Sequence, residues 1–129
     1  MIVVDCAAIV DALSGIADAD DLRKMLSAEE LHAPALLDFE VVSVVRGLTI
    51  SGRLSVPRAH DLLSDYDDLP LRRWPFAHGL RRRAFQLRNN VSPYDAAYVA
   101  LAEALECPLV TRDARLARSS GHAAEITLC

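Results

Sequence analysis

The segment that decides the fold of this 129-residue chain is Ile2-Val3-Val4-Asp5, at its N-terminus. Three consecutive β-branched residues, with no alternation of polar and apolar positions, are typical of a strand buried on both faces. A helical pattern begins directly afterwards at Cys6, so Asp5 stands where a strand ends and a helix starts. Strands of this kind belong to parallel sheets, and the segment therefore predicts Asp5 at the carboxyl edge of such a sheet.

Short apolar strands and helical patterns alternate over the rest of the chain. We predict further strands at 31–33, 69–74, 108–111 and 125–128. Helices are expected at 6–13, 19–28 and 35–50, from Ser55 onward, from Pro75 through Leu87, from Ser92 to about Glu106, and at 113–118. This alternation implies a parallel sheet with helices on both faces. We therefore predict a single domain over residues 1–129, a three-layer α/β/α fold with a central, mainly parallel sheet of four to five strands.

The composition excludes several classes of protein. Apolar residues make up 52% of the chain, which argues against disorder. No apolar run approaches the roughly 18 residues of a membrane span, and the N-terminus lacks the pattern of a secretory signal. We therefore expect a cytoplasmic protein without membrane contact. Cysteines and histidines are widely scattered, which argues against a disulfide framework, a zinc site or a histidine-based metal site.

The basic residues are unevenly distributed. The stretch between Leu71 and Tyr94 contains six arginines and no acid, and Lys24 is the single lysine of the chain. The planar guanidinium group suits phosphate, so this stretch can hold a polyanion, although a solvated helix face explains it equally well. The candidate phosphate contacts, including one arginine beside Asp113, are Arg72, Arg73, Arg81, Arg82, Arg83, Arg88 and Arg112.

Four carboxylates are predicted to converge at one pole of the sheet. Asp5 and Asp113 follow the ends of two strands. Asp95 lies in the first turn of the helix that opens at Ser92, and Glu40 lies in the second turn of the helix that starts near residue 35. In an open parallel sheet, ligands bind beyond the carboxyl ends of the strands. All four side chains can therefore reach one crevice.

Each of these acids also has a purely structural explanation. Asp5 and Asp113 can cap the helices that follow them, and Ser92 with Asp95 forms a capping arrangement. Glu40 can face solvent. Taken together, however, four close carboxylates repel one another by about 1 to 4 kcal/mol per pair. A divalent cation removes this repulsion, and Mg²⁺ needs only one or two direct carboxylates because it retains several waters.

Such a site suits the hydrolysis of phosphodiesters. A bound cation lowers the pKa of a water molecule and neutralises charge on the transition state, so no histidine or serine nucleophile is required. Asp5, Asp95 and Asp113 are the expected metal ligands, and Glu40 completes the catalytic quartet. The Thr111 hydroxyl can support a metal-bound water or a carboxylate; as a β-branched residue it can equally serve only to finish a strand.

Four segments in series resemble one known family. They are Ile2-Val3-Val4-Asp5, His32-Ala33-Pro34-Ala35-Leu36-Leu37-Asp38-Phe39-Glu40-Val41, Ser92-Pro93-Tyr94-Asp95-Ala96-Ala97-Tyr98-Val99-Ala100-Leu101-Ala102 and Leu109-Val110-Thr111-Arg112-Asp113. In this order and at these intervals they resemble the PIN-domain ribonucleases, and most closely the VapC toxins of bacterial VapBC toxin–antitoxin pairs.

The resemblance implies an RNA-cleaving enzyme that depends on Mg²⁺ or Mn²⁺ and whose acidic quartet is Asp5, Glu40, Asp95 and Asp113. It also implies a homodimer, and a VapB-type antitoxin whose C-terminal segment lies across the active site. A helical arm at about 53–68, with the preceding helix, would contribute to both contacts. Thr111 matches the small hydroxyl residue of the family. Ala7 departs from the pattern, since the family usually has Ser or Thr there; we expect weaker metal binding but retained activity.

Other functions fit the residues less well. A receiver domain needs a lysine near its last strands, and a haloacid-dehalogenase-like phosphatase needs an aspartate where this chain has Ala7. A catalytically weak or inactive RNA- or protein-binding module of the same fold remains as the alternative. It rests on Ala7, whereas four repelling charges have no use in a simple binding module.

Overall fold

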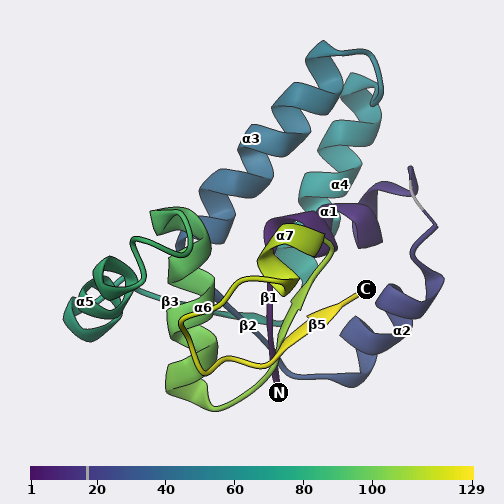
Figure 1. Cartoon of the computed structure of the whole chain (residues 1–129). Coiled ribbons are helices and arrows are strands. Elements are labelled where there is room, and N and C mark those ends of the chain that lie inside the picture. Colours follow the sequence, from purple (N-terminus) through teal and green to yellow (C-terminus); the bar gives the residue numbers. More distant parts are fainter. Residues whose placement is uncertain (17) are drawn as a thin grey trace.

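The computed structural model describes residues 1–16 and 18–129, and within them it shows a five-stranded sheet and seven helices (Figure 1). The elements in chain order are β1 (Ile2–Val4), α1 (Cys6–Ser14), α2 (Asp20–Ala28), β2 (Leu31–Pro34), α3 (Leu36–Ile50), α4 (Val56–Asp68), β3 (Leu71–Trp74), α5 (His78–Gln86), α6 (Pro93–Leu105), β4 (Leu109–Thr111), α7 (Ala114–Ala117) and β5 (Ile126–Leu128). The predicted α/β fold is confirmed.

The sheet is entirely parallel, with the strand order β3-β2-β1-β4-β5. All three residues of β1 are buried, as their β-branched side chains predict for the central strand. From β1 the chain adds β2 and β3 on one side and then continues on the other side with β4. The order therefore reverses between β1 and β4, and an open parallel sheet binds ligands at such a switch point, beyond the carboxyl ends of its strands.

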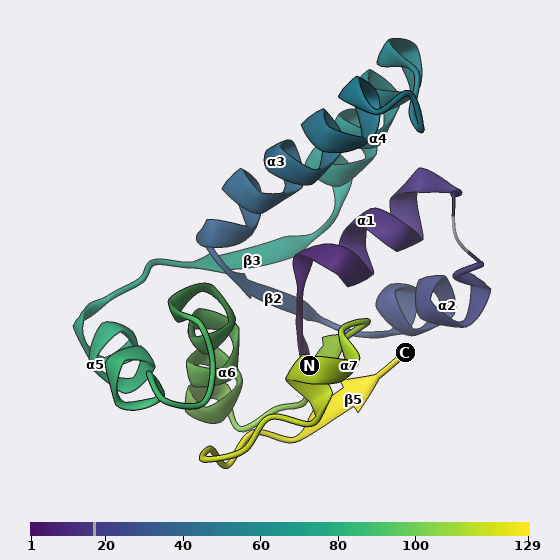
Figure 2. The same cartoon turned by 45° about the horizontal axis from the view of Figure 1, so that its top comes forward.

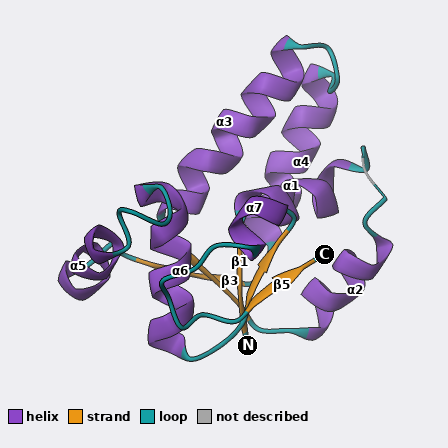
Figure 3. Cartoon of the chain, in the orientation of Figure 1, coloured by secondary structure: helices purple, strands orange, loops and turns teal. Residues whose placement is uncertain are grey.

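Helices cover both faces of this sheet (Figures 2 and 3). On one face α6 packs against β1, β2 and β4, and α5 packs against α6. Every residue of α6 from Ala96 to Ala102 is buried, because small alanines let the helix approach the sheet closely. On the other face, α1 contacts α3 and α4. The helices α3 and α4 form a hairpin that projects beyond the sheet and contains the arm expected at 53–68 (Figure 1).

Two predicted boundaries were wrong. The helix expected from Pro75 starts at His78, because Ala77 has extended backbone angles and its N–H donates to the Pro75 carbonyl at 2.8 Å. The strand expected from Leu69 starts at Leu71, because Leu69 instead forms the C-terminal cap of α4. In the described part of the chain, no helix combines the length and apolarity needed to cross a membrane.

Candidate active site

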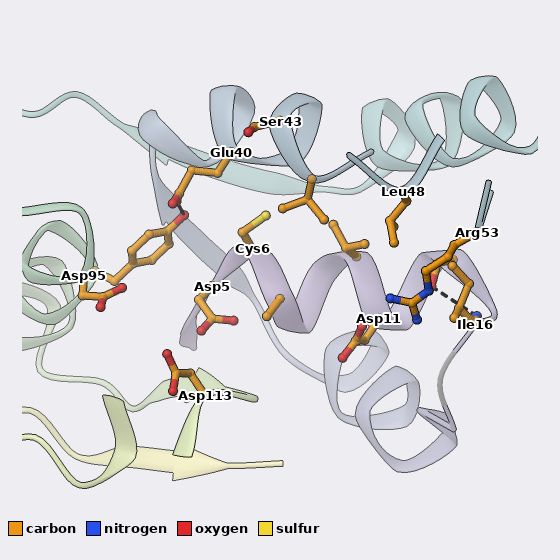
Figure 4. Close-up of a pocket in the computed structure, with 15 residues that line it drawn as sticks. Asp5, Cys6, Asp11, Ile16, Glu40, Ser43, Leu48, Arg53, Asp95 and Asp113 are labelled. Carbon is orange, nitrogen blue, oxygen red and sulfur yellow. Dashed lines mark hydrogen bonds between the residues drawn. The ribbon is translucent and has the colours of Figure 1, made fainter. Parts of the chain in front are cut away.

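An open cavity of about 470 Å³ lies at the carboxyl edge of the sheet, beside the switch point (Figure 4). All four predicted carboxylates line it, from four different elements or their caps. Figure 4 shows the labelled side chains of Asp5, Glu40, Asp95 and Asp113 grouped at one end. The other end lies between α1 and the C-terminal half of α3, where Val44 and Leu48 line it. The structure thus brings together residues that are up to 108 positions apart in the chain, from Asp5 to Asp113.

Asp5 is the most deeply buried of the four carboxylates, with 7% of the residue exposed. Its Oδ1 accepts a hydrogen bond of 2.9 Å from the Ala8 N–H, so it caps α1 as predicted. Its Oδ2 accepts a hydrogen bond from the Thr111 hydroxyl. The Thr111 hydroxyl in turn accepts from the Asp113 N–H at 2.9 Å. Thr111 therefore connects the ends of the two central strands, β1 and β4.

Asp113 and Asp95 also combine a position at the N-terminus of a helix with a place in the cavity. Asp113 precedes α7 and its Oδ1 accepts from the Arg115 N–H at 2.8 Å. The Asp95 N–H donates to the Ser92 hydroxyl at 3.2 Å, so Ser92 caps α6. Asp95 itself, in the first turn, directs its carboxylate toward the cavity (Figure 4). The structural and functional explanations of these residues are compatible, because a helix N-terminus favours a nearby anion in either role.

Glu40 is not a solvent-facing residue. Its Oε1 accepts a hydrogen bond of 2.6 Å from the hydroxyl of Tyr98, which also lines the cavity. Sequence reasoning did not single out Tyr98. The signal was present, however, since Tyr98 follows Asp95 by three positions in a helix and side chains at that spacing share a face.

The electrostatics of the cavity are those of crowded anions. Burial raises the pKa of Asp5, with further increases from Asp95 and Asp113. Burial also raises the pKa of Glu40 and of Asp95, and neighbouring carboxylates add to both effects. Asp113 differs, because a hydrogen bond from the Arg115 backbone lowers its pKa. Three of the four carboxylates thus ionise at an energetic cost, which a cation in the cavity would remove.

The donor set fits a hydrated hard cation. The carboxylates supply only oxygen ligands, which Mg²⁺ and Mn²⁺ accept. Within residues 1–16 and 18–129, no group of three or more His, Cys, Asp or Glu side chains stands close enough to ligate an ion without rearrangement. With a volume of about 470 Å³, the cavity has room for an ion together with bound water. This is the usual coordination of Mg²⁺, which retains several of its waters.

Cys6 also lines the cavity, but it is no candidate nucleophile. Burial, together with the nearby Glu40 and Asp5 carboxylates, raises the pKa of its thiol to about 12. The thiol therefore stays protonated at neutral pH. Cys6 and Cys107 are buried free thiols, as their apolar surroundings predict.

The seven candidate arginines divide into two groups. Arg73, Arg83 and Arg112 form ion pairs of 2.7–2.8 Å with Asp38, Glu103 and Asp11. The other four do not pair with acids in the described part of the chain: Arg72 lies over Trp74, Arg88 lies over Phe85, Arg81 binds the Phe76 carbonyl, and Arg82 is exposed. None of these seven arginines is among the described residues that line the cavity. Arg53, which the sequence did not single out, lines its far end.

Comparisons with known proteins agree with this architecture. The family model described as the PIN domain matches residues 2–121. Ribonuclease VapC12 of Mycobacterium tuberculosis is 40% identical over 99% of this chain and 98% of its own length. Ribonuclease VapC1 of the same species is 45% identical over 98% of this chain and 96% of its own.

Solved structures share the fold. A toxin–antitoxin complex from Klebsiella pneumoniae aligns with a TM-score of 0.70 at 16% identity, covering 98% of this chain and 96% of that one. VapBC2 from Rickettsia felis, bound to a DNA fragment from its promoter, aligns with a TM-score of 0.68 at 16% identity, covering 98% of both chains. At this identity the likeness concerns the fold alone.

Proposed function

The chain belongs to the PIN domain family and to its VapC ribonucleases, and we propose that Asp5, Glu40, Asp95 and Asp113 form the active site with which it cleaves RNA. The observation that supports this assignment is the convergence of the four carboxylates on one cavity at the switch point of the sheet. We further propose that residues 1–129 act as one PIN domain, because β5 (Ile126–Leu128) belongs to the same sheet as β1.

A divalent cation, Mg²⁺ or Mn²⁺, is the proposed cofactor. When bound, it would lower the pKa of a water molecule and neutralise charge on the phosphate under attack. Asp5, Asp95 and Asp113 would hold the ion directly or through water, and Glu40 would orient its waters. Thr111 would keep Asp5 in place, since its hydroxyl donates to Oδ2 while the Ala8 N–H occupies Oδ1.

For RNA contact we propose a first set among the seven arginines: Arg72, Arg81, Arg82 and Arg88. Their positive charges are not neutralised by an acid in the described residues. Arg73, Arg83 and Arg112 are already paired and would contribute less. Replacing a true phosphate contact flattens the salt dependence of RNA binding, so Arg82→Gln should reduce that slope and Arg83→Gln should change it less.

The antitoxin is the proposed partner, and the far half of the cavity is its proposed binding site. The PIN-fold structures reported above include toxin–antitoxin and VapBC complexes. In this chain Val10, Val44 and Leu48 line the cavity beyond the carboxylates. A VapB-type segment could place apolar side chains there and a basic side chain against the four acids. RNA and antitoxin together make the cytoplasm the proposed place of action.

We also propose a homodimer that uses the arm and α3. Phe39 is 81% exposed and Val42 is 57% exposed, and their spacing of three puts them on one face of α3. Phe39→Ser should shift the molar mass measured by light scattering from dimer to monomer. Phe85→Ser is the matched control, because Phe85 is 68% exposed on α5, outside both α3 and the arm. A dimer that is lost in both variants would extend the interface to α5, and one that survives Phe39→Ser would remove α3 from it.

The decisive experiment is RNA cleavage with Mg²⁺ or Mn²⁺ by the wild-type chain and by Asp5→Asn and Asp95→Asn. Both variants should lose at least about a hundredfold in rate, since loss of even an outer-sphere partner costs 10- to 100-fold. Asp11→Asn is the matched control, because Asp11 lines the same cavity but pairs with Arg112 at 2.7 Å. Cleavage that both active-site variants retain would refute the assignment.

The alternative, an inactive binding module, is favoured by one observation. Ala7 lines the cavity at the position where the family resemblance leads us to expect Ser or Thr. The absence of cleavage of any RNA by the wild-type chain, with cleavage appearing in Ala7→Ser, would support this alternative.

A further inference from the structure

Tyr98 makes a contact that joins the two helices of the active site. Its hydroxyl donates a hydrogen bond of 2.6 Å to Glu40 Oε1, from α6 to α3. Tyr98 is 2% exposed and is packed into the core on α6, whereas Glu40 is only half-buried on α3. The rigid partner of this hydrogen bond is therefore the tyrosine, and the side chain that it holds in place is the glutamate.

The contact has a consequence for the cavity. A glutamate side chain has three rotatable bonds, and ordering it costs up to about 2 kcal/mol of conformational entropy. The Tyr98 hydroxyl occupies Oε1 and leaves Oε2 without a side-chain hydrogen bond among the described residues. A carboxylate fixed in this way presents one free oxygen in one direction, which is what the orientation of a metal-bound water requires.

The structure offers a second tyrosine–carboxylate pair for comparison. Tyr66 donates to Asp38 Oδ1, also at 2.6 Å, again from a buried tyrosine to a carboxylate on α3. There, however, the Arg73 guanidinium binds both oxygens of Asp38, and neither Tyr66 nor Asp38 lines the cavity. The Tyr66 pair is thus a structural contact, and it is an internal control for the Tyr98 pair.

We propose that Tyr98 is a positioning residue that acts through Glu40, holding its carboxylate by Oε1 so that Oε2 stays available to orient water around a bound cation. This proposal rests on the proposed function of the carboxylates. It concerns a residue outside the quartet, and it explains why Glu40 can serve the site although it stands on a helix, where the sheet does not fix its position.

The first test compares Tyr98→Phe with Tyr66→Phe in RNA cleavage and in Mn²⁺ binding followed by electron paramagnetic resonance. Tyr98→Phe should lower kcat and Mn²⁺ affinity by about tenfold, with KM within about twofold, because one hydrogen bond to a charged group is lost. Tyr66→Phe should leave all three within about twofold. Equal values for wild type and Tyr98→Phe would overturn the proposal.

The second test is a double-mutant cycle on Mn²⁺ affinity with Glu40→Ala. If Tyr98 acts through Glu40, Tyr98→Phe should not lower Mn²⁺ affinity further in the Glu40→Ala background. A further tenfold loss in the double variant would assign Tyr98 a general structural role and refute the proposal. The cycle does not depend on cleavage. A failure of the proposed function would instead be seen as Mn²⁺ binding or cleavage that is unaffected by Asp5→Asn.

Discussion

Two carboxylates on α3, Asp38 and Glu40, have similar contacts with a tyrosine but different electrostatic surroundings. They are two positions apart, and each accepts a hydrogen bond of 2.6 Å from a tyrosine. Burial would raise the pKa of Asp38, but Tyr66 and Arg73 reverse this and the net shift is downward. Burial raises the pKa of Glu40, and Asp95 and Asp5 raise it further despite the Tyr98 hydrogen bond. Asp38, which has Arg73 as its counter-ion, is therefore a stabilising carboxylate, whereas Glu40, which has none among the described residues, is a candidate catalytic one.

The largest expected difference between the two is in catalysis. Glu40→Gln should slow RNA cleavage by about ten- to a hundredfold, because the neutral amide orients metal-bound water poorly. Asp38→Asn should leave the rate within about threefold, measured in the same single-turnover assay. Similar losses of rate in both variants would show that Glu40 matters no more for cleavage than Asp38 does.

Divalent metal should stabilise the folded chain through the cavity that Glu40 lines, and this stabilisation should not depend on Asp38. A ligand at 100 times its dissociation constant adds about 2.7 kcal/mol to the free energy of unfolding. The midpoint temperature of thermal unfolding of the wild-type chain should therefore rise with saturating Mg²⁺ or Mn²⁺. The shift should vanish in Asp5→Asn and persist in Asp38→Asn; a shift that survives in Asp5→Asn would place the ion elsewhere.

Asp38 should matter for stability instead. Asp38→Asn should lower the free energy of unfolding by about 1 kcal/mol, since Tyr66 and Arg73 lose a charged acceptor that is partly exposed. Urea unfolding measures this change. Glu40→Gln should not lower the metal-free stability, because it removes a charge that burial and neighbours disfavour. Equal destabilisation by both substitutions would contradict the comparison.

The smallest effect concerns pH in the absence of metal. The folded-state pKa values of Asp5, Glu40 and Asp95 are raised above their ordinary values of 3.8, 4.5 and 3.8. The folded chain thus binds more protons than the unfolded chain between the ordinary and the raised values. The contribution of these three groups to stability must therefore rise as the pH falls through that window.

Asp38 has a lowered pKa, and its contribution should be lost only at still lower pH, as it becomes protonated. In the presence of a chelator, the free energy of unfolding contributed by these groups should increase on acidification in the wild-type chain and increase less in Asp5→Asn. An identical pH dependence in the two proteins would contradict the raised pKa of Asp5.

The sequence by itself determined the class of fold and the four acids that line the cavity of the candidate site. The β-branched run before Asp5 predicted a buried parallel strand, and the capping chemistry of Asp5, Asp95 and Asp113 placed these acids at helix starts. These predictions succeeded because a strand buried on both faces and a capped helix start leave local patterns. The predicted start of α5 at Pro75 was wrong, because the extended residue Ala77 precedes the helix without a side-chain cap and leaves no such pattern.

Only the tertiary structure decided which charges are compensated. The sequence around Arg73, Arg83 and Arg112 does not indicate which acid each of them pairs with. Arg112 even has Asp113 beside it but pairs with Asp11, and two of the three partners are more than 30 positions away. The same holds for Tyr98 and Glu40, which are 58 positions apart. Ion pairs and hydrogen bonds between distant segments depend on how the helices pack. Packing thus decided that, among the residues the structure describes, Asp38 has a counter-ion and Glu40 has a single hydroxyl to hold it.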